Sequence, residues 1–173
     1  MRIEPFTEDH DQLRQTIRRW VAEEITPHAA EWEAEGIFPR EVFTRAGDLG
    51  FLGLSVPEEW GGSGGDYWAT VVWGEELGVQ TDMATPPIHE FGTDEQKRRW
   101  LEPAMRGEKI AAIAITEPDA GSDVAGIRTC AVRDGDDWII NGAKTYITNG
   151  TRADFCTMVV RTAGKPGDHS GVS

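Results

Sequence analysis

Residues 115–123 read Ile-Thr-Glu-Pro-Asp-Ala-Gly-Ser-Asp, and residues 138–150 read Trp-Ile-Ile-Asn-Gly-Ala-Lys-Thr-Tyr-Ile-Thr-Asn-Gly. In the first stretch, apolar alternation runs into a turn, so a strand would deliver Thr116 and then expose backbone N–H groups beside a hydroxyl. Such an arrangement suits an anion. In the second stretch, two Asn-Gly pairs between strand-like runs predict type I′ hairpins, because both central residues of that turn need positive φ. The residues alone therefore indicate a β-rich module with a turn for a cofactor or a phosphate.

The sequence before this module has the periodicity of helices. Apolar residues recur at three-to-four-residue steps from about Glu8 to Trp32, which predicts a helix that Pro27 ends or bends. Thr93 with Gln96 three residues later forms a capping-box pattern, which predicts a helix that ends near Gly107. Shorter helices are expected at 39–48 and 66–77.

After about residue 110 the period changes to that of strands. The order of helices first and strands afterwards predicts an α+β fold. We expect an N-terminal helical domain at 1–109 and a partial antiparallel β-sheet or barrel domain at 110–173. The expected strands are 111–116, 127–132, 137–140, 143–148 and 154–161, with a turn at Asp134-Gly135.

Composition narrows the possible partners. Thirty acidic residues against 17 basic ones give a net charge of −13, which disfavours nucleic acid. No stretch approaches the ~20 apolar residues of a membrane span and the start lacks an apolar signal core, so we expect no membrane insertion and a cytoplasmic location. Cys130 and Cys156 are expected to be reduced packing thiols. The histidines lack metal-ligand spacing, so we expect no metal site.

Both opening stretches resemble motifs of the acyl-CoA dehydrogenase family, whose members typically carry T-E-P-x-x-G-S-D and then I-N-G-x-K-x-(W/Y/F)-I-T-N-G. Segments at 38–39, 49–54, 57–62 and 91–97 also resemble the N-terminal helical region of that family. The resemblance implies FAD as the cofactor and α,β-dehydrogenation of a fatty acyl-CoA thioester, with straight-chain substrates. It also implies electron-transfer flavoprotein as the electron acceptor and a homo-oligomer.

The same resemblance assigns the cofactor-binding residues. Thr116 and the backbone at Ile115 would lie against the isoalloxazine, and Gly121 with Ser122 would approach the pyrophosphate of FAD. Tyr146 and Thr148 would flank the ring near its reactive nitrogen, and Ile113 completes the set. Tyr146 stands where Trp is common in the family. Glu117 is assigned to support of the turn and not to proton abstraction.

Each assignment has a structural alternative. Thr116, Tyr146 and Thr148 also fit ordinary strand composition, because β-branched and aromatic residues favour strands. Residues 121–123 also fit a turn in which Asp or Ser bonds to the local backbone. Ser122 is a poor nucleophile, since no G-x-S-x-G elbow surrounds it and no neighbouring His could act as its base.

The sequence departs from the family in two places. Only residues 78–80 stand between Leu77 and Thr81, where relatives usually have a longer helical stretch, a loss of about three helical turns. The sequence ends at Ser173, inside the expected middle β-domain. We therefore expect the C-terminal helical bundle and its catalytic Glu to be absent and the chain to be inactive alone. Two alternatives stay open: a non-catalytic half-protein or remnant that binds or scaffolds, and an acyl-CoA oxidase or flavin monooxygenase.

Overall fold

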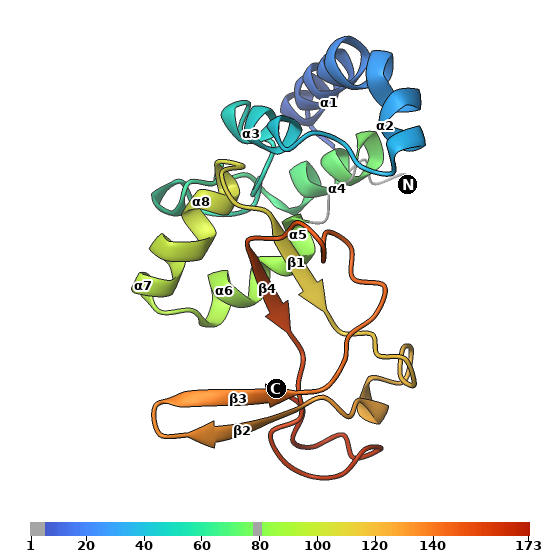
Figure 1. Ribbon diagram of the computed structural model, residues 1–173. Helices are drawn as coiled ribbons and strands as arrows, with labels where there is room; N and C mark the ends of the chain where they lie inside the picture. The colour runs from blue at the N-terminus through green and yellow to red at the C-terminus, as the bar shows by residue number, and fades with distance from the viewer. Residues whose placement is uncertain (1–5, 78–80) are drawn as a thin grey trace, which may run out of the picture. The chain divides into compact units, whose positions relative to one another are not determined.

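The computed structural model describes residues 6–77 and 81–173, and side chains are described except at 1–5 and 78–82. The chain divides into two compact units, Met1–Ile110 and Ala111–Ser173 (Figure 1). Helices make up the first unit and the strands lie in the second, which confirms the α+β class. The predicted departure from the family at residues 78–80 lies outside the described residues. No helix in the described ranges combines the length and the apolar character needed to cross a bilayer.

The first predicted helix is present, but its hydrogen-bonding pattern changes from α-helical to π-helical and 3₁₀ near Pro27. The α-helix α1 (Glu8–Trp20) continues as a π-helix η1 (Val21–Ile25), then as a 3₁₀ turn η2 (Thr26–His28) and the α-helix α2 (Ala29–Glu35). Proline has no N–H and its ring clashes with the preceding turn, so regular α-helical pairing cannot pass through it. Gly36 ends α2 in the left-handed conformation, with φ 72°.

The helices expected at 39–48, at 66–77 and from Thr93 to near Gly107 are present. Thr93 and Gln96 form the predicted capping box, with the Gln96 N–H 3.2 Å from Thr93 Oγ1 and the Thr93 N–H 2.8 Å from Gln96 Oε1. The elements are α3 (Glu41–Asp48), η3 (Glu58–Trp60), α4 (Tyr67–Glu76), α5 (Thr81–Ala84), α6 (Pro86–Phe91), α7 (Asp94–Gln96), η4 (Lys97–Leu101) and α8 (Glu102–Met105). Among these, η3, α5 and α6 were not expected from the sequence.

The core of the helical unit is aromatic. Trp20 from α1 and Trp73 from α4 stack with ring centroids 6.2 Å apart, and Phe51 lies 5.5 Å from each ring. All three side chains are buried. Arg14 and Arg18 on α1 both pair with Glu76 on α4, at 2.8 and 2.7 Å. Apolar contact and ion pairs therefore join the same two helices.

The second unit contains two small two-stranded sheets and no closed barrel among the described residues. Strand β1 (Ala111–Ala114) pairs with β4 (Phe155–Met158) in parallel, and β2 (Cys130–Asp134) pairs with β3 (Asp137–Asn141) in an antiparallel hairpin. A 3₁₀ turn η5 (Val124–Gly126) lies between β1 and β2. The expectation of an antiparallel sheet therefore holds for β2 and β3 only. Both cysteines lie on strands and are free thiols.

The predicted strand at 143–148 is wrong, and so are the Asn-Gly hairpins. Tyr146 and Asn149 have φ of 55° and 64°, left-handed values that interrupt an extended strand. Gly142 also has positive φ, and a Cβ there would collide with Thr129, so glycine is required. The hairpin turn is instead at Gly135, φ 62°, between β2 and β3.

Candidate functional site

The segment that leaves β1 folds back on itself at once. The N–H of Glu117 donates to the carbonyl of Ala120 at 2.7 Å, and the N–H of Ala120 donates back at 3.3 Å. Gly121 and Ser122 then follow, exposed to solvent. Their backbone N–H groups have no acceptor within the described residues. Successive exposed N–H groups beside a hydroxyl are the arrangement expected for an anion site.

The structure brings Thr116 close to two other parts of the predicted site. A Cβ added at Gly121 would lie 3.9 Å from Thr116 Cγ2, so the two residues are neighbours with open space beside the glycine. The N–H of Thr145 donates to the carbonyl of Thr116 at 2.9 Å, which fixes the residue before Tyr146 against the end of β1. Ile115, Thr116 and Gly121 therefore lie near residues 144–146.

Other predicted site residues lie more loosely. Tyr146 is 93% exposed. Ser122 and Thr148 are also exposed, and no hydrogen bond joins either of them to Thr116 in the described parts of the chain. Ile113 lies within β1 and is paired in register with Thr157 of β4. The structure thus brings Ile115, Thr116 and Gly121 together, whereas the three exposed residues make no hydrogen bond to Thr116 within the described ranges.

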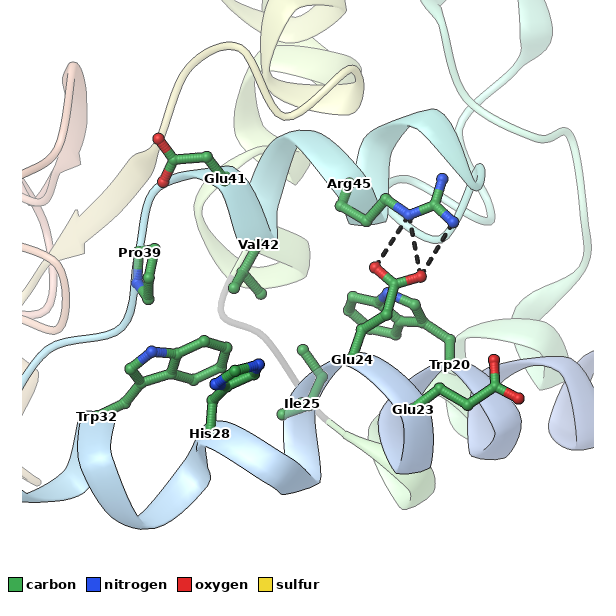
Figure 2. Close-up of a pocket in the computed structure, with 10 residues that line it drawn as sticks. All are labelled: Trp20, Glu23, Glu24, Ile25, His28, Trp32, Pro39, Glu41, Val42 and Arg45. Atoms are coloured by element: carbon green, nitrogen blue, oxygen red, sulfur yellow. Dashed lines mark hydrogen bonds and ion pairs between the residues drawn. The ribbon is translucent and has the colours of Figure 1, made fainter.

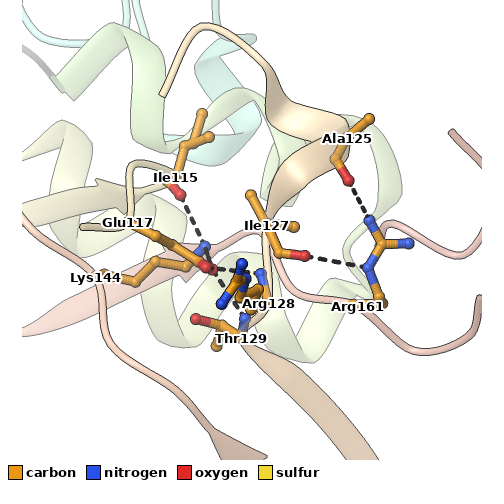
Figure 3. Close-up of polar contacts among 8 residues, drawn as sticks. All are labelled: Ile115, Glu117, Ala125, Ile127, Arg128, Thr129, Lys144 and Arg161. Atoms are coloured by element: carbon orange, nitrogen blue, oxygen red, sulfur yellow. Dashed lines mark hydrogen bonds and ion pairs between the residues drawn. The ribbon is translucent and has the colours of Figure 1, made fainter. Parts of the chain in front are cut away.

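A buried ion pair lies beneath this group. Lys144 Nζ is 2.8 Å from Glu117 Oε1, and the two side chains are 7% and 5% exposed. The same ammonium group donates to the carbonyl of Ile115 at 2.8 Å. The Glu117 carboxylate also accepts the backbone N–H groups of Arg128 and Thr129, at 2.7 and 3.0 Å. Figure 3 shows these contacts converging on the one carboxylate.

The contacts keep Glu117 ionised. Burial alone raises the pKa of a carboxyl group, but here hydrogen bonds from Lys144 and from the Arg128 and Thr129 N–H groups outweigh it and lower the pKa to about 2. A carboxylate with all these donors and so low a pKa is a weak proton acceptor at neutral pH. The geometry agrees with the supporting role that the resemblance assigns to Glu117.

A second buried cation, Arg161, binds the segment after β1 at residues 125 and 127. Arg161 is 5% exposed, and its guanidinium donates to the carbonyl of Ala125 at 2.6 Å and to that of Ile127 at 3.2 Å. Figure 3 shows both bonds. The remaining donors reach carbonyls of Ala163, Asp168 and Ser170 at 3.3 to 3.4 Å. Every acceptor of this side chain is a backbone carbonyl.

Sequence reasoning assigned no role to Lys144 or Arg161. The available signal was Lys144 as a lone cation in the strand-like run of one motif, together with Glu117, assigned to support of the turn, in the other motif. Arg161 ends an apolar run and had no comparable signal, because its partners are carbonyls that any residue carries.

The β unit also contains a cavity of about 460 Å³ on one face of the β1–β4 pair. Ala112 and Ala114 contribute from β1, and Cys156 and Met158 contribute from β4. Alternate strand residues point to opposite faces, so Ile113 belongs to the other face. None of the seven predicted cofactor residues lines this cavity. The full lining is Ala112, Ala114, Lys144, Ile147, Gly150, Thr151, Ala153, Phe155, Cys156 and Met158.

A separate groove of about 440 Å³ lies within the helical unit, between α3 and the η1–α2 segment. Figure 2 shows the stacked rings of His28 and Trp32, 5.3 Å apart, opposite Val42. The carboxylate of Glu24 is paired with Arg45 at 3.0 Å at the other end. None of the predicted cofactor residues lines this groove. Among the described residues no group of three or more potential metal-ligating side chains occurs.

Each of the two units matches a domain of a known protein family. Residues 7–108 match the family model of the acyl-CoA dehydrogenase N-terminal domain, and residues 112–173 match that of the middle domain. The long-chain specific acyl-CoA dehydrogenase of pig mitochondria is 41% identical over 167 residues, which are 91% of this chain and 39% of that protein.

Solved structures give the same result. An acyl-CoA dehydrogenase from Geobacillus kaustophilus is 42% identical with a TM-score of 0.91, over 98% of this chain and 48% of that one. An acyl-CoA dehydrogenase complexed with FAD from Bacillus anthracis is 30% identical with a TM-score of 0.81, over 95% and 31%. The chain spans less than half the length of these relatives. Since both of its units match consecutive domains of one family, the chain belongs to the acyl-CoA dehydrogenases.

Proposed function

We propose that this chain contributes the N-terminal helical region and the cofactor-holding part of the middle β-domain to an FAD-dependent acyl-CoA dehydrogenase. The observation that carries the proposal is the exposed turn at Gly121 and Ser122, with two unpaired N–H groups, fixed beside Thr116 and the residues around Thr145. The complex of the Bacillus anthracis relative with FAD supports this choice of cofactor.

The residues present fit parts of an FAD molecule. Gly121 and Ser122 supply N–H groups and a hydroxyl suited to the pyrophosphate, and the glycine leaves room for close approach of the backbone. Thr116, Ile115 and Ile113 would lie against the isoalloxazine. Tyr146 has its aromatic face free in solvent, and with Thr148 it would flank the ring.

The chemistry follows from that placement. When bound, FAD supplies the hydride acceptor for oxidation of the carbon–carbon bond next to an acyl-CoA thioester. The residues of this chain bind and orient the cofactor. Glu117 does not remove the substrate proton, because its carboxylate is buried, paired with Lys144 and has a pKa of about 2. We assign no general base within residues 1–173.

The partners follow from the family. We propose a straight-chain fatty acyl-CoA as the substrate and electron-transfer flavoprotein as the acceptor of electrons. A homo-oligomer and a cytoplasmic location stay predictions.

A titration with FAD tests the proposal. The purified chain is expected to quench flavin fluorescence at a stoichiometry of one and to give the bound flavin a structured visible absorption band. Gly121→Val places a branched side chain where the cofactor should approach, and it is expected to weaken FAD binding. A wild-type chain that leaves flavin fluorescence unchanged would overturn the proposal.

Turnover is the second part of this test. Because we assign no general base within residues 1–173, we expect FAD binding without oxidation of acyl-CoA by the purified 173-residue chain. Flavin-dependent turnover by this chain alone would contradict that expectation.

A second candidate is a non-catalytic half-protein that binds or scaffolds. FAD binding in the titration supports the proposal that this chain is the cofactor-holding region of a dehydrogenase. A folded chain without affinity for FAD supports the non-catalytic half-protein instead. An acyl-CoA oxidase or flavin monooxygenase would be distinguished by rapid reaction of its reduced flavin with oxygen.

A further inference from the structure

We infer that Lys144 and Arg161 are positioning residues for FAD, which hold the two ends of the loop at residues 115–127 without touching the cofactor. The inference rests on the proposed function. This segment, called the cofactor loop below, contains Thr116, Gly121 and Ser122. Both anchoring cations come from later parts of the chain, so the loop takes its shape from contacts that it does not itself supply (Figure 3).

Lys144 holds the beginning of the cofactor loop. Its ammonium group binds the carbonyl of Ile115 and the carboxylate of Glu117, each at 2.8 Å. These two acceptors lie on either side of Thr116, so the backbone of Thr116 is fixed from both neighbours. The next residue, Thr145, donates its N–H to the Thr116 carbonyl at 2.9 Å. A single segment thus fixes the position of the residue proposed to face the isoalloxazine.

Arg161 holds the end of the cofactor loop. Its guanidinium binds the carbonyls of Ala125 and Ile127 at 2.6 and 3.2 Å. Ala125 lies three residues after Ser122, in the turn that immediately follows the proposed pyrophosphate site. The N–H of Gly167 donates to the same Ala125 carbonyl at 2.7 Å. The position of this turn therefore depends on residues some forty places later in the sequence.

The middle of the cofactor loop has few contacts of its own. Pro118, Asp119 and residues 121–124 are exposed. The backbone pair between Glu117 and Ala120 closes only residues 117–120, and the ion pair of Asp119 with Arg128 is exposed and 3.7 Å long. A loop with so few internal contacts stays ordered only if its ends are fixed, and an ordered loop loses less conformational entropy when a ligand binds.

Both cations act through the loop and not by contact. Lys144 lines the cavity on the β1–β4 face, but none of the predicted cofactor residues does, and its ammonium group is bound to Ile115 and Glu117. The Lys144 side chain is 7% exposed and Arg161 is 5% exposed. All three guanidinium nitrogens of Arg161 already donate to carbonyls. The acceptors of Arg161 named above are neutral backbone carbonyls, so its role is to hold the backbone at Ala125 and Ile127.

The test compares FAD affinity and loop protection in matched variants of the full 173-residue chain. Lys144→Met and Arg161→Met remove the anchoring groups while keeping an unbranched apolar side chain. Lys144→Arg keeps a cation that can reach both acceptors. The control is Arg14→Met, which removes the ion pairs of Arg14 with Glu75 and Glu76 in the helical unit. Affinity is measured by flavin fluorescence at a temperature where circular dichroism shows each variant folded.

We expect Lys144→Met and Arg161→Met to weaken FAD binding by about tenfold or more, as supporting groups around a binding site commonly do. Amide hydrogen exchange in residues 117–126 should become faster in both variants without FAD present. Lys144→Arg should recover most of the affinity, and Arg14→Met should leave both measurements unchanged. A merely structural role would lower thermal stability in all of these variants and leave the affinity of the folded fraction unchanged.

If Lys144→Met does not fold, the double variant Lys144→Met/Glu117→Gln removes both buried charges and tests the same anchor. Wild-type affinity in Arg161→Met together with wild-type affinity in Lys144→Met, or in the double variant if Lys144→Met does not fold, would overturn the inference while leaving the proposed function intact. A wild-type chain that does not bind FAD would overturn the proposed function instead. Exchange in residues 117–126 would then still report whether the two cations order the loop.

Discussion

The helical unit is built around stacked aromatic rings, whereas the β unit is built around buried charges. In the first, Trp20, Phe51 and Trp73 fill the space between helices, and the ion pairs of α1 with α4 lie at its margin. In the second, Glu117 and Arg161 are themselves buried and bind backbone groups. Apolar packing tolerates some repacking, but a buried charge needs each of its partners. We therefore expect the β unit to tolerate fewer substitutions at its buried positions than the helical unit does.

The largest effect is expected from the aromatic core. Trp73→Ala removes a side chain that is 1% exposed and touches both other rings, so unfolding of the helical unit should lose about 4 kcal/mol, as is usual for a large-to-small change of a buried Trp. Urea denaturation followed by helical circular dichroism measures the loss. Phe91→Ala is the control in the same unit, because this Phe is 87% exposed and should cost less than about 0.5 kcal/mol. Equal effects of the two variants would contradict the comparison.

A somewhat smaller effect is expected from the buried ion pair. Lys144→Met leaves the Glu117 carboxylate buried without its cation, which should destabilise the β unit by about 3 kcal/mol. Adding Glu117→Gln in the same chain removes the uncompensated charge and should recover a large part of this loss. Hydrogen exchange of the β2 and β3 amides gives the stability of the β unit separately. A double variant as unstable as Lys144→Met would show that the charge is not the cause.

The smallest of the three effects concerns pH. The pKa of Glu117 is lowered from 4.5 to about 2, so the folded state favours the ionised form more than the unfolded state does. This contribution to stability is complete above about pH 5 and is lost as the pH falls from 4.5 toward 2. At pH 3.5 the loss should be about 1 kcal/mol relative to pH 7.

The control for the pH effect is Glu117→Gln, which should make the stability of the β unit less dependent on pH between 5 and 3. An unchanged slope in this variant would assign the acid sensitivity to other carboxylates. The helical unit should show no corresponding change in slope, since Glu117 lies in the β unit.

Local signals in the sequence were reliable where a residue acts on its own neighbours. Thr93 and Gln96 cap a helix because both hydrogen bonds lie within four residues, and Pro27 disturbs the helix because of its own ring. Gly135 forms the predicted turn between β2 and β3. Thr116 and Gly121, which stand in one motif, are neighbours in the structure, and their role in binding a cofactor stays a prediction.

The failures share a different cause. Residues 143–148 alternate like a strand, yet Lys144 is drawn to Glu117 and the N–H of Thr145 to Thr116, so the backbone turns at Tyr146. The parallel pairing of β1 with β4 joins residues more than forty positions apart. Neither result follows from periodicity, because the competing partner is distant in the sequence.

The sequence by itself determined the family, the order of helices before strands, and the ends of helices that depend on capping and proline residues. These features rest on interactions within a few residues or on motifs read directly. Only the tertiary structure decided that Lys144 and Arg161 fix the two ends of the cofactor loop. The reason is physical: a buried cation is stable only where acceptors converge on it, and those acceptors come from segments that the fold alone brings together.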